Sequence, residues 1–139
     1  MPQARASVEL LAPRGDVWRF LAEPHHLADW WPDLASVEPD RRGVAAGARW
    51  RVRSRGATLF RRPRSEDTLL VTAADPESRF AFELVRAKLR VELTLLPAGE
   101  GHTRAELVVT GPLLLAFSRG LPRAALARLH DLCQTAAAL

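Results

Sequence analysis

Polar side chains able to transfer a proton or hold an anion gather in the middle of the sequence. They are Arg62, Glu66, Asp67, Glu83 and Arg86. In an alternating strand over residues 78–86, Glu83 and Arg86 fall on opposite faces. Arg86 then shares the apolar face of Phe80 and Phe82, where an arginine needs an anionic partner or ligand. Arg86 could therefore clamp a carboxylate, but its position at the strand end favours a side chain that points into solvent.

The other reactive side chains do not form a catalytic or metal-binding arrangement. His25 and His26 are adjacent, so their rings diverge on a helix, and no further His or Cys stands at ligand spacing. Cys133 falls on the apolar stripe of a C-terminal helix, where a free cysteine behaves as a small buried hydrophobe. The polar residues of the middle region form no compelling acid–base pair. We therefore expect no metal and no cofactor, assign no catalytic residue, and leave an enzymatic role open.

Arginines form the most pronounced electrostatic feature of the sequence. Residues 47–55 place Trp50, Val52 and Ser54 on one face of a strand, and the alternating arginines on the other: Arg49, Arg51, Arg53 and Arg55, with Arg61, Arg62 and Arg64 nearby. A solvated outer sheet face is the simplest interpretation. An anionic lipid surface, an acidic partner and nucleic acid are the alternatives.

Nucleic acid is disfavoured as a partner. Trp50 alternates away from the arginine face, which leaves that face without aromatic residues on which bases could stack. The pI is 10.8, but the formal net charge is only +4. The high pI reflects 19 arginines against a single lysine, because arginine keeps its charge to very high pH. We expect no nucleic-acid partner.

The length and composition indicate one domain over residues 1–139. Hydrophobic residues make up 47% and charged residues 26% of the 139 positions, values typical of a globular protein. No apolar run approaches the roughly 18 residues of a membrane span, and the N-terminus has no apolar core of a signal peptide. One cysteine cannot form an intrachain disulfide, so a cytoplasmic location is the simplest inference. The oligomeric state stays open.

Apolar periodicity predicts a strand, two short helices, six more strands and a C-terminal helix. Pro13 suits a first helical turn, and Pro24 and Pro32 stop the two short helices. The last segment, residues 112–139, has helical spacing with a kink expected near Pro122. The expected strands are residues 4–11, 34–40, 47–55, 66–74, 78–86, 88–96 and 103–110. Short turns between consecutive strands imply antiparallel pairing.

Three stretches resemble the START/Bet v 1-like (SRPBCC) superfamily, most closely its polyketide cyclase/dehydrase-like branch. They are SVELLAPRGDVWRFLAEPHHLADWWPDLASVE at residues 7–38, GARWRV at residues 47–52, and HTRAELVVTGP at residues 102–112. The order of elements matches the superfamily over essentially the whole chain. The resemblance implies an α+β helix-grip fold, in which a curved antiparallel sheet of about seven strands surrounds a long C-terminal helix.

The resemblance also implies a cavity between the sheet and that helix. The expected partner is a small hydrophobic molecule such as a lipid or a polyketide, which a protein of this kind binds in the cavity and can also carry. A cyclase or dehydratase acting on a polyketide-like substrate is the alternative, and a co-chaperone-like partner-binding role stays open. Phe80, Phe82 and Leu93 could instead form a filled core. The candidate ligand-binding residues are Trp30, Trp31, Trp50, Phe80, Phe82, Arg86, Leu93, Phe117 and Leu121.

Overall fold

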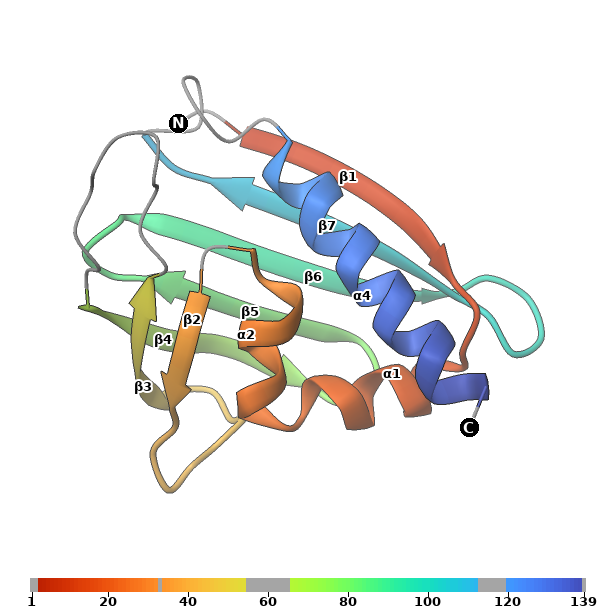
Figure 1. Cartoon of the computed structure of the whole chain (residues 1–139), viewed down its shortest axis with the longest axis horizontal. Helices are drawn as coiled ribbons and strands as arrows, with labels where there is room; N and C mark the ends of the chain where they lie inside the picture. The colour runs from red at the N-terminus through yellow and green to blue at the C-terminus, as the bar shows by residue number, and fades with distance from the viewer. Residues whose placement is uncertain (1–2, 33, 55–65, 113–119, 139) are drawn as a thin grey trace.

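The computed structural model describes residues 3–32, 34–54, 66–112 and 120–138. Its strands and helices follow one another along the chain as Figure 1 shows. The elements are β1 (Gln3–Leu10), α1 (Arg14–Leu21), the 3-10 turn η1 (Pro24–His26), α2 (Leu27–Trp30), β2 (Leu34–Glu38), β3 (Arg49–Ser54), β4 (Glu66–Asp75), β5 (Arg79–Leu84), β6 (Leu89–Pro97), β7 (Thr103–Thr110) and α4 (Leu121–Ala138).

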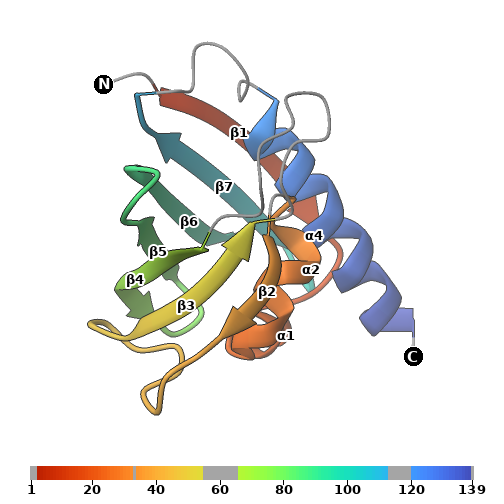
Figure 2. The same cartoon turned by 60° about the vertical axis from the view of Figure 1, so that its left-hand side comes forward.

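The seven strands form one antiparallel sheet in the order β1-β7-β6-β5-β4-β3-β2. Strands β2 to β7 therefore pair with their neighbours in sequence, and β1 closes the far edge against β7. The sheet curves, and the helices lie together on its concave side (Figures 1 and 2). Helix α4 contacts β1, β7 and α2. The predicted α+β helix-grip fold is confirmed.

Alternation along the strands explains which side of the sheet is buried. In β3, Trp50 and Val52 are buried, whereas Arg49, Arg51 and the neighbouring Arg53 are exposed. The same two-residue period recurs in β6 and β7, and antiparallel pairing places Leu93 directly opposite Phe80. Side chains with this period point to one face, so the sheet presents a continuous apolar surface to the helices.

Strand β5 is shorter than the sequence predicts, and this changes the position of Arg86. The strand ends at Leu84, and residues 85–88 form a turn. Lys88 has φ of 55°, a left-handed conformation that lies outside the strand region. Arg86 consequently lies in the turn, and strand alternation no longer determines its direction.

Helix α4 begins at Leu121, so Pro122 occupies its first turn. A proline is tolerated there because the N–H it lacks would have no partner within the helix. Residues 113–119 of the predicted segment lie outside the described residues, so the kink expected near Pro122 stays a prediction. No helix in the described part of the chain is long and apolar enough to cross a membrane.

Candidate functional site: the concave face and a surface pocket

Aromatic side chains form a continuous row across the concave face of the sheet. Trp30 packs edge-on against Trp31, with ring centres 5.9 Å apart, and Trp31 packs edge-on against Phe82 at 5.6 Å. Phe82 contacts Phe80 at 5.5 Å, and Phe80 contacts Trp50 at 6.4 Å. Residues from α2, β3 and β5 therefore meet in one cluster, here called the aromatic row.

All five rings of the aromatic row, together with Leu93, are at most 1% exposed. Such burial removes a large apolar area from water, and edge-on or tilted ring pairs add to the stabilisation. The structure therefore brings together six of the predicted ligand-binding residues: Trp30, Trp31, Trp50, Phe80, Phe82 and Leu93. Their contact with a ligand stays a prediction.

Trp50 holds the end of the aromatic row to the preceding loop. Its indole Nε1–H donates a hydrogen bond of 2.9 Å to the backbone carbonyl of Gly43. Because the indole N–H already has this partner, Trp50 presents only apolar ring atoms to its neighbours. The sequence pattern predicted burial of Trp50, but it did not identify the Gly43 carbonyl as the hydrogen-bond partner of the indole, because that contact depends on the path of the loop before β3.

The buried interior offers few polar groups for chemistry. Thr103 is the buried polar residue of the described core, and its hydroxyl donates a 2.7 Å hydrogen bond to the carbonyl of Ala12. No buried side-chain nitrogen or oxygen within the described ranges lacks a hydrogen-bond partner. The described part of this face is thus suited to apolar contact, and it contains no group poised for acid–base catalysis.

The remaining candidate residues lie apart from the aromatic row. Leu121, the first residue of α4, is partly buried against the core. Arg86 is exposed, and its guanidinium Nη1 donates a 3.1 Å hydrogen bond to the carbonyl of Glu66. Phe117 lies outside the described residues, as do Arg62 and the basic stretch around it.

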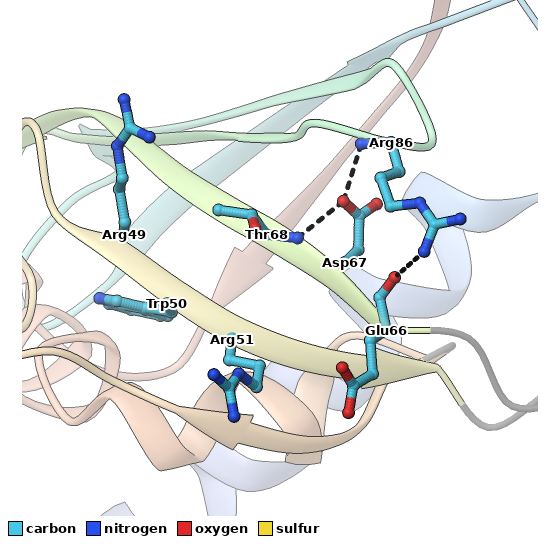
Figure 3. A pocket seen from close by; sticks show the side chains of 7 residues that line it. All are labelled: Arg49, Trp50, Arg51, Glu66, Asp67, Thr68 and Arg86. Carbon is cyan, nitrogen blue, oxygen red and sulfur yellow. Dashed lines mark hydrogen bonds between the residues drawn. The ribbon is translucent and has the colours of Figure 1, made fainter.

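Arg86 instead lines a surface pocket of about 410 Å³ at the β3–β4 pair. Figure 3 shows the residues around it, which come from β3, β4 and the turn after β5. Arg51 lies directly opposite Thr68 in the β3–β4 register, so both belong to the exposed face of the sheet. The lining residues are Arg49, Trp50, Arg51, Glu66, Asp67, Thr68 and Arg86.

The other reactive side chains have structural surroundings. His25 lies 2.8 Å from the Glu23 carboxylate, which also accepts the backbone N–H of His25, and these hydrogen bonds hold the pKa of Glu23 below its usual value. Burial raises the pKa of the Cys133 thiol to about 11, which suppresses the reactive thiolate. Among the described residues, no group of three His, Cys, Asp or Glu side chains could hold a metal ion.

The sheet topology, the concave apolar face and the packed C-terminal helix define a helix-grip protein. Residues 1–135 match the family described as "Polyketide cyclase / dehydrase and lipid transport". The chain belongs to this family. No curated protein matches the sequence.

Solved structures share the fold at low sequence identity. A Deinococcus radiodurans protein is 19% identical, with a TM-score of 0.73 over 97% of this chain and 99% of its own. A Nitrosomonas europaea protein is 17% identical, with a TM-score of 0.74 over 99% of this chain and 97% of its own. The di-domain ARO/CYC protein BexL of the BE-7585A biosynthetic pathway is 19% identical, with a TM-score of 0.67 over 94% of this chain and 46% of its own.

Proposed function

We propose that the protein binds a small hydrophobic molecule, such as a lipid or a polyketide, between the concave face of the sheet and α4. The observation that carries the proposal is the aromatic row, an extended apolar surface whose described polar groups are already satisfied. Membership of a family described by both cyclase activity and lipid transport supports the same ligand class. Carriage of the ligand between sites is part of this proposal.

Binding would require the interior to open. The rings of the aromatic row contact one another and are nearly inaccessible to solvent. A hydrophobic molecule must therefore separate Trp30 and Trp31 of the α2 end from Phe82 of the sheet. The ligand would bind the open state. Its apparent affinity is therefore lower when a smaller fraction of the molecules is open.

Tryptophan fluorescence tests both the binding and its location. A fluorescent fatty acid that enters the interior accepts excitation energy from the buried indoles, and the Trp31→Phe variant should lower this transfer markedly. Trp18→Phe is the matched control, because Trp18 on α1 is only partly buried and outside the aromatic row. The proposal fails if native mass spectrometry finds no co-purified hydrophobic molecule and the protein takes up no such probe.

A cyclase- or dehydratase-type enzyme is the alternative, favoured by the family description and by the likeness to BexL. Its candidate groups, however, lie away from the aromatic row: Glu83 is partly buried on the opposite side of β5, and Arg86 is exposed in the following turn. If a hydrophobic substrate is turned over, Glu83→Gln and Arg86→Ala test these two groups. Turnover that survives both changes excludes them from the chemistry.

A further inference from the structure

We propose that the surface pocket at the β3–β4 pair binds a phosphate group, as a site separate from the hydrophobic interior. Arg49, Arg51, Glu66 and Thr68 of its lining are exposed on the outer face of the sheet. The aromatic row, which shares Trp50 with the pocket lining, lies on the concave face. Its volume of about 410 Å³ lies within the range of small-molecule sites. The two proposals can therefore succeed or fail independently.

Three guanidinium groups line the pocket, and few carboxylates lie close enough to neutralise their positive charges. Among the described residues, the guanidinium of Arg49 makes no ion pair or hydrogen bond, and that of Arg51 lies 3.8 Å from the exposed carboxylate of Glu38. Arg86 donates to the neutral carbonyl of Glu66. On the same sheet face, Arg53 and Arg79 have carboxylates at 2.8 and 2.9 Å. The guanidinium groups of the pocket arginines thus keep N–H donors free. Arg53 and Arg79 use theirs in close ion pairs with carboxylates.

The two carboxylates of the pocket already have partners. Glu66 accepts from the guanidinium of Arg53 at 2.8 and 3.0 Å. One oxygen of Asp67 accepts the backbone N–H groups of Thr68 and Arg86 at 2.7 Å, and the other accepts that of Ala87 at 3.1 Å. As the dashed lines of Figure 3 show, Asp67 is directed into the turn that carries Arg86, and it holds this turn against β4.

These charges match a phosphate group better than a single carboxylate. Arg49 and Arg51 are two residues apart on one strand face, which separates their backbones by about 7 Å. Guanidinium groups bind phosphate through paired N–H donors, and a phosphomonoester carries a charge of about −1.5 to −2 at neutral pH. The exposed hydroxyl-bearing Thr68, between the arginines and the turn, adds a neutral donor.

Calorimetric titration with inorganic pyrophosphate at low ionic strength tests the site. Arg49→Gln and Arg86→Gln should each weaken binding about tenfold, because each removes a charged donor. Arg90→Gln is the matched control, since Arg90 is an exposed arginine of the same sheet outside the pocket. It should change the affinity less than twofold. All three replaced side chains are exposed, so the variants should melt within about 2 °C of the parent protein.

Vesicles identify the source of the phosphate. Co-flotation with phosphatidylcholine vesicles containing phosphatidic acid, lost in Arg49→Gln and retained in Arg90→Gln, supports the site and assigns it to a lipid headgroup. Binding of pyrophosphate with the same variant pattern, without vesicle binding, supports the site and assigns it to a soluble phosphate compound. The proposal is overturned if the parent protein binds neither probe, or if Arg90→Gln weakens binding as much as Arg49→Gln.

Discussion

Replacing Phe82 by alanine tests whether the aromatic row is a packed core. Phe82 lies at the centre of the row, 1% exposed, with ring contacts to Trp31 at 5.6 Å and to Phe80 at 5.5 Å. The Phe82→Ala variant removes both contacts and leaves a void, because neighbouring backbone elements relax only partially after a large-to-small change. A packed ring and a ring that faces an open cavity predict different losses of stability.

For a packed ring, the expected cost is about 3–5 kcal/mol of unfolding free energy. Domains of this kind are stable by about 5–15 kcal/mol, so the loss is a large share of the total. In a urea denaturation followed by circular dichroism, it should lower the midpoint by about 2 M at an unchanged slope. The void should also let the variant bind a small apolar molecule such as benzene, which an apolar engineered cavity accepts.

Leu96→Ala provides the control, because Leu96 of β6 is 38% exposed and should cost less than about 1 kcal/mol. A loss below about 2 kcal/mol in Phe82→Ala refutes the packed arrangement, since a ring with open space on one side has fewer contacts to lose. In that case the aromatic row would line a space already large enough for a ligand.

Three further predictions concern single groups outside the aromatic row. Thr103→Val should destabilise the protein by about 1–3 kcal/mol, because it leaves the Ala12 carbonyl without its 2.7 Å partner; Thr103→Ser should retain most of the stability, and equal denaturation midpoints for the two variants would contradict the argument. The backbone N–H groups of Arg49, Arg42 and Gly43 hold the pKa of Asp40 below its usual value of 3.8. The stabilisation from Asp40 is therefore complete above about pH 4 and is lost as the pH falls through the lowered pKa, so the melting temperature should fall more steeply on acidification in the parent protein than in Asp40→Asn; parallel pH profiles would show that this carboxylate does not contribute. Cys133, 4% exposed and with its pKa raised to about 11, should resist a thiol reagent at pH 8 in the native protein and react rapidly in denaturant; rapid labelling without denaturant would show that the α4 packing opens readily.

Local sequence patterns were sufficient for most of the elements. Alternation in residues such as Trp50 and Val52 identifies both the strand and its buried face, because a two-residue period maps directly onto the two sides of a sheet. Pro24 and Pro32 follow the ends of the two short helices, as the sequence predicted. Pro122 was expected to kink a longer helix, and it lies in the first turn of α4. Short turns between consecutive strands indicated antiparallel pairing, and the resemblance supplied the wrapping of the sheet around the C-terminal helix, which periodicity alone does not contain.

Tertiary structure decided which of these residues meet. Trp31 and Phe82 are 51 positions apart, and only the placement of α2 against β5 brings their rings together. The sequence left Arg86 either on the apolar face or, as the strand-end position favoured, in solvent. The turn after Leu84 places it at the surface, where it lines one pocket with Arg49 and Arg51. Neither result is encoded in a local period, because each depends on contacts between segments distant in sequence. The sequence by itself therefore determined the elements and their apolar faces, and the folded chain determined the aromatic row and the arginine pocket.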